Sequence, residues 1–291
     1  MELSKGHRLY LTLIIGITIL LGEVIGGLLS NSLALLSDAG HVFTDICALS
    51  LSMAASAIAN KPVDSRATYG YRRFGLLAAL INGILLVAMS VILFIETYKR
   101  FAAPPVVNST MMLYVAAAGL IGNLLMAVVL SQGDKDLNVK SALFHVIGDL
   151  LASIGVLISA VVIHFTKFYI ADPIAGFIAN FLIISSGIKI IKDTVWVFLE
   201  FTPTGYNVER ISELLREVPE VEGIHDVHVW SISDGVPAFS AHVLVKDRKL
   251  SEADEVRKKV EDKLNEMGIK HNVLQFECVD CGNNMLYCKG H

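Results

Sequence analysis

Long apolar stretches alternate with short polar connections through the first two-thirds of the chain. Each stretch approaches or exceeds the roughly 20 residues that an α-helix needs to cross the hydrocarbon core of a bilayer. The run from Leu9 to Leu29 is of this length and no small-residue cleavage site follows it, so we interpret it as a crossing rather than a signal peptide. The pattern predicts six membrane-spanning helices, at 8–29, 33–59, 74–98, 110–131, 141–165 and 172–199.

After about residue 200 the apolar stretches shorten and charged residues become frequent. Amphipathic periodicity predicts helices at 207–217 and 251–267, the second opening on a capping-box pattern at Ser251, and strands are predicted at 225–233, 238–245 and 273–278. A Ser-Asp-Gly turn joins the first two strands as a hairpin. The order helix–strand–strand–helix–strand predicts a small α+β domain at 204–291, after an all-α membrane domain at 1–203.

The composition agrees with this division. The chain of 291 residues is 54% hydrophobic and 18% charged, whereas a soluble globular domain carries about 25% charged residues. The net charge of −4 comes without a basic run, so nucleic acid is not an expected partner.

The distribution of Lys and Arg predicts the orientation. The N-terminal flank and the second and fourth connections together carry eight of these residues, and the first, third and fifth connections carry three. By the positive-inside rule, both termini and the C-terminal domain are expected in the cytoplasm.

Two copies of one pattern lie inside the apolar stretches: His41 with Asp45, and His145 with Asp149. Residues four apart share a helix face, and two imidazoles with two carboxylates can form a tetrahedral Zn²⁺ site. The alternative is an intrahelical hydrogen bond within each pair, but the cost of ionisable groups in a membrane favours a functional site. Asp38 lies one turn before His41, where it either orients an imidazole or stands at the helix entry.

Three other polar residues of the apolar stretches are assigned structural roles. Glu23 and Asn82 are expected to pack the bundle through hydrogen bonds. Asp172, which precedes Pro173, is expected to cap the N-terminus of its own helix.

The C-terminal domain carries a second candidate set of metal ligands. A Cys-x-x-Cys pair has the spacing of a zinc knuckle, although it is also compatible with a redox pair. His228 is three residues from His225, so strand alternation predicts that the two face opposite ways and that His228 is not a ligand. The candidate ligands are His225, His242, His271, Glu277, Cys278 and Cys281, with Cys288 nearby.

The run from Ser32 to Asp45 resembles the second helix of the cation diffusion facilitator family of zinc transporters. The connection from Ser131 to Lys140 lacks the His-rich loop of many eukaryotic relatives, so the chain resembles a shorter, prokaryotic-type member of the family. Such a member is expected in the prokaryotic cell membrane. Similar segments follow in the family's order, at 69–72, 77–82, 138–145, 171–173, 200–203, 225–230 and 240–242.

The resemblance implies six helices, a ferredoxin-like cytoplasmic domain, a homodimer, and export of a divalent metal in exchange for protons. It also implies regulatory metal ions bound by the cytoplasmic dimer. Together with the His and Asp pairs, it predicts a zinc/proton antiporter rather than an enzyme, with Zn²⁺ as substrate and regulatory ligand. A metal-sensing receptor and an intramembrane metalloenzyme are the alternative classes.

Overall fold

The computed structural model describes the backbone of residues 5–131, 137–279 and 286–287, and the side chains of 10–126, 128–129, 150–279 and 286–287. The chain folds into two compact units. The first comprises Met1–Ala54 and Ala78–Ile191, and the second comprises Ala55–Leu77 and Lys192–His291. The second unit thus contains the connection near residues 60–72 in addition to the C-terminal domain.

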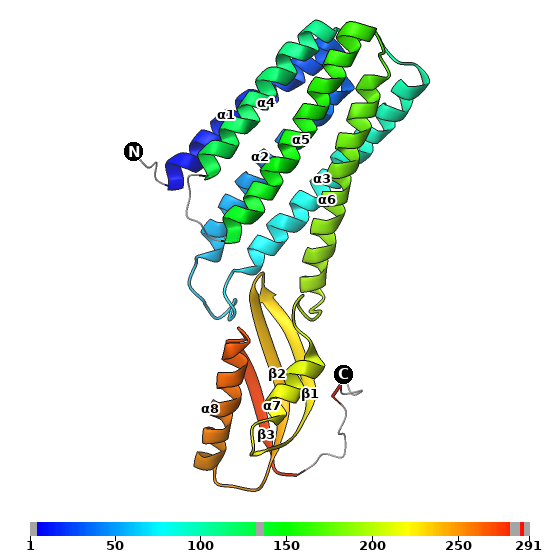
Figure 1. The fold of residues 1–291 in the computed structure, drawn as a ribbon. Helices are drawn as coiled ribbons and strands as arrows, with labels where there is room; N and C mark the ends of the chain where they lie inside the picture. Colours follow the sequence, from blue (N-terminus) through cyan, green and yellow to red (C-terminus); the bar gives the residue numbers. More distant parts are fainter. Residues whose placement is uncertain (1–4, 132–136, 280–285, 288–291) are drawn as a thin grey trace. The chain divides into compact units, whose positions relative to one another are not determined.

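Six long helices follow one another from the N-terminus (Figure 1). Their bounds lie within a few residues of the predicted crossings. Five are long and apolar enough to cross a membrane among the described residues, and the described part of the fifth helix includes an apolar segment at Leu150–Thr166. The helices are α1 Lys5–Ser30, α2 Leu33–Ala59, α3 Arg73–Ala102, α4 Ser109–Ser131, α5 Leu137–Thr166 and α6 Ala171–Phe198.

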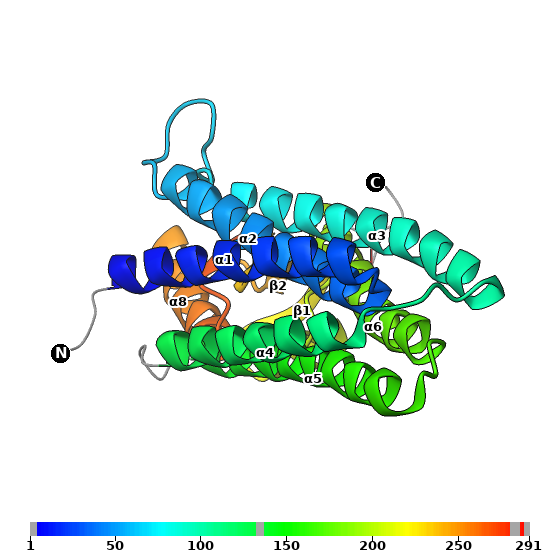
Figure 2. The same ribbon diagram turned by 90° about the horizontal axis from the view of Figure 1, so that it is seen from above.

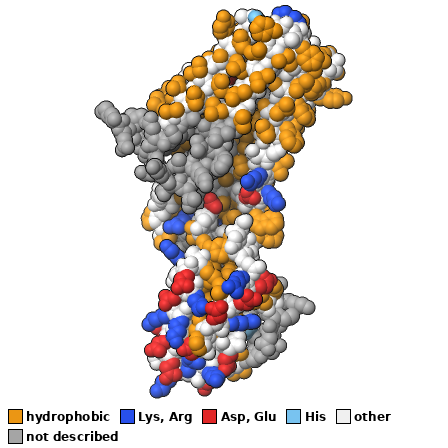
Figure 3. Space-filling view, in the orientation of Figure 1, with side chains coloured by type: hydrophobic (Ala, Val, Ile, Leu, Met, Phe, Trp, Pro, Cys, Tyr) orange, Lys and Arg blue, Asp and Glu red, His pale blue; other side chains and the backbone are white. Residues whose placement is uncertain are grey.

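Within the first unit, α4 packs against both α1 and α5, as the two ribbon views agree (Figures 1 and 2). On another side of the unit α3 packs on α6, where the rings of Phe94 and Phe177 meet edge-on at 5.4 Å. On the face shown in Figure 3, hydrophobic side chains cover most of the described surface of these helices. Large exposed apolar side chains of this kind are expected on helices that face lipid.

Asp172 does not cap its own helix. It lies within the first turn of α6, and its fully buried carboxylate accepts hydrogen bonds from the start of α2, including the backbone N–H of Leu33 at 2.7 Å and of Ala34 at 3.2 Å. The hydroxyl of Ser32 donates to the same carboxylate, and Arg100 of α3 lies 3.9 Å from it. Asp172 therefore satisfies the otherwise unpaired N–H groups at the N-terminus of α2.

The C-terminal domain has the predicted order α7 Val208–Arg216, β1 Val221–Ser233, β2 Val236–Val245, α8 Leu250–Glu266 and β3 His271–Glu277. The strands lie in the order β1-β2-β3, with β1–β2 antiparallel and β2–β3 parallel. Side chains of α7 and α8, such as Leu215 and Leu264, bury one face of the sheet together with Phe239.

The start of α8 departs from expectation. The predicted capping box at Ser251 is wrong, because α8 already begins at Leu250 and its N-cap residue makes no side-chain hydrogen bond.

Strand β1, at the edge of the sheet, has a further hydrogen-bond partner. The N–H of Val227 in β1 donates to the carbonyl of Leu286 at 3.0 Å. A described residue near the C-terminus thus pairs with the outer strand.

Candidate metal sites

The first candidate site begins on α2. Nε2 of His41 lies 3.9 Å from Oδ2 of Asp45, with exposed side-chain fractions of 15% and 33%. This distance exceeds a hydrogen bond, so these two atoms do not form the intrahelical bond that the alternative interpretation requires. Both side chains remain close enough to share an ion.

The other two candidate ligands, His145 and Asp149, are on α5. Their side chains lie outside the described residues, but the level of α5 beside α2 is fixed by a hydrogen bond one turn away. The hydroxyl of Ser153 donates to Asp38 Oδ2 at 3.0 Å, and both side chains are buried.

The spacing along each helix extends this level to the candidate ligands. His41 is three residues after Asp38 and Asp149 is four residues before Ser153. The helices α2 and α5 run in opposite directions (Figure 1). With a rise of about 1.5 Å per residue, three residues along α2 and four residues along α5 lead to similar distances from the hydrogen bond, so His41 and Asp149 are expected at similar heights. Asp45 lies four residues after His41 on α2, and His145 lies four residues before Asp149 on α5, so these two positions are also expected at similar heights.

A buried polar layer surrounds the hydrogen bond that fixes this level. Asn123 of α4 donates to the hydroxyl of Ser153 at 2.9 Å, and the Glu23 carboxyl of α1 faces Asp38. A Cβ on Gly119 would stand 2.4 Å from a Glu23 oxygen, so a larger residue at this position would force the carboxyl to move. The sequence pattern did not single out Asn123 or Ser153, because neither residue belongs to a repeated spacing such as that of the His and Asp pairs.

The second candidate site lies on the face of the sheet away from α7 and α8. His225 Nε2 is 3.3 Å from Glu277 Oε2, and His242 Nδ1 is 2.8 Å from Glu277 Oε1. One ligand atom from each of the three residues lies within 4.8 Å of the others. Strand pairing produces this convergence, since β1 places His225 directly opposite His242 and Glu277 ends the adjacent strand β3.

The donor set of this cluster fits a zinc ion. Two imidazoles and a carboxylate are common zinc ligands, and their mutual distances suit bonds of about 2.0–2.2 Å. The Glu277 oxygen that faces His225 is buried and accepts no hydrogen bond from the described residues. An ion between the three side chains would be coordinated by this oxygen.

The remaining candidates from the sequence do not join this cluster among the described residues. The ring of His271 instead stands edge-on to Tyr69, with 5.5 Å between centroids. Cys278 is an exposed free thiol. Cys281 and Cys288 lie outside the described residues.

His228 lies on the same face as His225, contrary to the expected alternation. In the β1–β2 ladder His225 pairs with His242 and His228 pairs with Ser240, so three steps along β1 match two steps along β2. The extra residue is a β-bulge, which shifts every following side chain to the other face. Neither the bulge nor the contact that Asp226 makes with these histidines was predicted.

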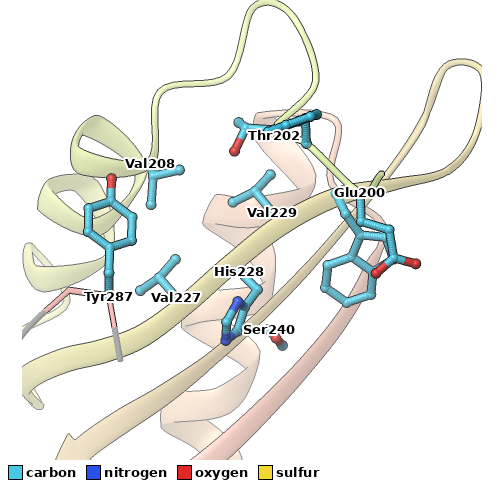
Figure 4. A pocket seen from close by; sticks show the side chains of 10 residues that line it. Glu200, Thr202, Val208, Val227, His228, Val229, Ser240 and Tyr287 are labelled. Atoms are coloured by element: carbon cyan, nitrogen blue, oxygen red, sulfur yellow. The ribbon is translucent and has the colours of Figure 1, made fainter. Parts of the chain in front are cut away.

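A cavity of about 460 Å³ adjoins this part of β1 (Figure 4). His228 lines it beside Ser240, and Val227 and Val229 form part of its wall. The hydroxyl of Tyr287, also at the cavity, donates to Glu209 at 2.6 Å, which lowers the pKa of that carboxyl and raises the pKa of Tyr287. Most of the residues that line the cavity are apolar, and Glu200 is the one acidic residue among them.

Comparison with known families covers almost the whole chain. Residues 9–199 match the cation efflux transmembrane domain, and residues 203–277 match the cytoplasmic domain of cation efflux proteins. The two matched segments correspond to the six long helices and to the α+β domain.

Individual relatives are similar over most of their length. A cadmium, cobalt and zinc/H⁺-K⁺ antiporter of Bacillus velezensis is 41% identical over 88% of this chain and 83% of its own. The metal cation efflux system protein CzcD of Cupriavidus metallidurans is 36% identical over 91% and 84%. The zinc transporter ZitB of Pectobacterium atrosepticum is 36% identical over 100% and 90%.

These matches extend through both parts of the chain and agree with its helical and α+β architecture. The relatives are named as transporters rather than enzymes. The chain therefore belongs to the cation efflux family, the cation diffusion facilitators, and is a metal-cation transporter.

Proposed function

We propose that the protein exports Zn²⁺ in exchange for protons through a site formed by His41, Asp45, His145 and Asp149. The observation that carries this proposal is the hydrogen bond between Asp38 and Ser153. It supports equal heights for the two His and Asp pairs, which a shared four-ligand site requires. The names of the relatives, several of which are zinc transporters or antiporters, favour zinc as the substrate.

The ligand chemistry suits release as well as binding. Thiolates favour very tight structural zinc sites, whereas the proposed set has only nitrogen and oxygen ligands. Metal binding requires neutral imidazoles, so protons compete directly with the ion for these residues. Alternating access would expose the site first to the side that supplies zinc and then to the side that supplies protons.

The proposed orientation places both termini and the C-terminal domain in the cytoplasm. The excess of Lys and Arg in the corresponding connections supports it, as does the match of residues 203–277 to a cytoplasmic domain family. We also propose that the protein acts as a homodimer in the cell membrane, as the resemblance to this family implies. Zinc then enters the site from the cytoplasm.

The test is a transport measurement on purified protein in liposomes, with a zinc-sensitive dye and a pH-sensitive dye inside. A zinc gradient should drive zinc into the liposomes and protons out of them, and an imposed proton gradient should drive zinc movement. Zinc movement that leaves the internal pH unchanged, in liposomes of low proton leak, would contradict the exchange mechanism.

We further propose that His225, His242 and Glu277 bind a regulatory zinc ion. Regulation requires that the bound ion favour one arrangement of the transporter over another. We expect His242→Ala to lower the transport rate at limiting zinc while zinc binding at the intramembrane site persists. His271→Ala is the matched control, because this histidine contacts Tyr69 rather than the cluster. Equal rates in the parent and in His242→Ala would exclude regulation through this cluster.

A metal-sensing receptor is the second functional class to test. It would use the C-terminal cluster and leave the membrane helices as an anchor, so purified protein would not move zinc in liposomes. The paired His and Asp residues of α2 and α5 favour transport, because an anchor has no need of ionisable residues in its helices.

A further inference from the structure

We propose that Asp226 is a positioning residue for the C-terminal metal cluster: its carboxylate holds the His242 ring so that Nδ1 faces the metal position. This inference rests on the proposed binding of zinc by His225, His242 and Glu277. Neither the sequence pattern nor the family match assigns a role to Asp226. The structure offers three observations for it.

The first observation is the backbone at Asp226. This residue has φ of 51°, in the left-handed region that side chains other than glycine rarely adopt. It lies in the bulge between His225 and His228. Bulges often redirect a side chain beside a functional site, and aspartate tolerates the left-handed conformation better than most residues.

The second observation is the environment of the two ring nitrogens of His242. Nδ1 lies 2.8 Å from Glu277, and Nε2 lies 3.6 Å from Oδ2 of Asp226. Metal-binding histidines usually donate their second N–H to a carboxylate or carbonyl, which fixes the tautomer and the ring orientation. A small rotation of the ring would bring the distance at Nε2 to that of a hydrogen bond.

The third observation is the position of His228. Its Nε2 lies 3.3 Å from Oδ1 of Asp226, so the carboxylate stands between two imidazoles. The Asp226 side chain is 15% exposed, whereas that of His228 is 48% exposed and lines the cavity of Figure 4. The two histidines thus face different oxygens of the same carboxylate, His228 facing Oδ1 and His242 facing Oδ2.

The geometry favours positioning over a second metal ion at Asp226. Ligand atoms of His225, His242 and Glu277 converge within 4.8 Å, but Asp226, His228 and His242 form no such group among the described residues. A second ion bound by Asp226 and His242 would also need both nitrogens of the His242 ring as ligands at once. One ion at the cluster, with Asp226 behind His242, requires only a neutral imidazole.

The test measures zinc affinity at the cluster in full-length protein in detergent, by competition with a chromophoric chelator. All variants carry Asp45→Ala so that the intramembrane site contributes less, and Glu277→Ala defines the signal of the cluster. The absorption spectrum of bound Co²⁺ provides a second readout of the ligand geometry.

Asp226→Asn is the informative variant. Asparagine has the same size and suits a left-handed backbone, but its amide can turn its NH₂ toward His242 and select the wrong tautomer. An Asp-to-Asn exchange has this effect in serine protease triads. We expect zinc affinity to fall by about 10–100-fold, with a changed Co²⁺ spectrum. Asp226→Gly should lose at least as much affinity, and His228→Gln should stay close to the parent.

Each outcome has a definite consequence. If Asp226→Asn and Asp226→Gly keep the parent affinity, or if they lower the unfolding temperature of the metal-free protein, Asp226 only shapes the bulge and the inference fails. If the parent protein binds two zinc ions and Glu277→Ala loses both, the cluster is a two-metal site and Asp226 is not a positioning residue. If the parent protein binds no zinc at the cluster, both the proposed cluster and this inference are wrong. If Glu277→Ala lowers the zinc affinity but Asp226→Asn leaves it unchanged, only this inference is wrong.

Discussion

Zinc transport into liposomes is expected to be lost in Asp45→Ala. The substitution removes one of four proposed ligands and a negative charge that offsets the charge of the ion inside the membrane. Loss of an outer partner of a metal ligand typically costs about 10–100-fold in metal affinity or activity. Loss of the ligand itself should therefore lower the initial rate by more than about 100-fold.

Cys47→Ala is the matched control for this measurement. Cys47 lies on α2 two residues beyond Asp45 and is half-buried, so its removal alters the same segment without removing a proposed ligand. It should keep the parent rate. If Asp45→Ala also transports zinc at that rate, the transported ion does not depend on this carboxylate, and the proposed site is wrong.

The second large effect is expected on stability, in Asp172→Ala. The substitution leaves the N–H groups of Leu33 and Ala34 and the Ser32 hydroxyl without their buried acceptor. Loss of a helix cap costs about 0.5–2 kcal/mol, and each further buried donor left unsatisfied costs about 1–3 kcal/mol. We expect the free energy of unfolding to fall by about 3 kcal/mol or more, measured by denaturation in detergent.

Two further variants separate the capping role from a general effect of the substitution. Asp172→Asn keeps one acceptor oxygen and should lose only part of the stability. Asp193→Ala removes an exposed aspartate from the same helix and should change the free energy of unfolding by no more than about 0.5 kcal/mol. Equal stability of the parent and Asp172→Ala would mean that this carboxylate does not hold the start of α2.

Hydrophobic periodicity was sufficient to predict the order of the elements. Each crossing needs a long apolar run, and the strands and helices of the C-terminal domain follow their own periods, so their ends fell within a few residues of the predicted ones. Strand pairing also follows from the hairpin turn at Asp234 and Gly235, which helps to bring His225 opposite His242.

Contacts between segments that are distant along the chain could not be predicted from the sequence pattern. The pattern Asp172-Pro173 is compatible with a cap on its own helix, and only the packing of α6 beside α2 redirects the carboxylate. The face of His228 was predicted wrongly because one extra residue in β1 breaks the two-residue period. Bulges of this kind depend on the partner strand and have no reliable signature in a single chain.

The bond from Val227 to Leu286 bears on any attempt to study the C-terminal domain as a soluble fragment. Strand β1 lies at the edge of the sheet, and unpaired N–H groups on edge strands recruit other chains. A fragment that ends before Leu286 would expose the Val227 N–H beside the bulge. Its tendency to aggregate would then report the missing strand partner rather than a property of the metal cluster.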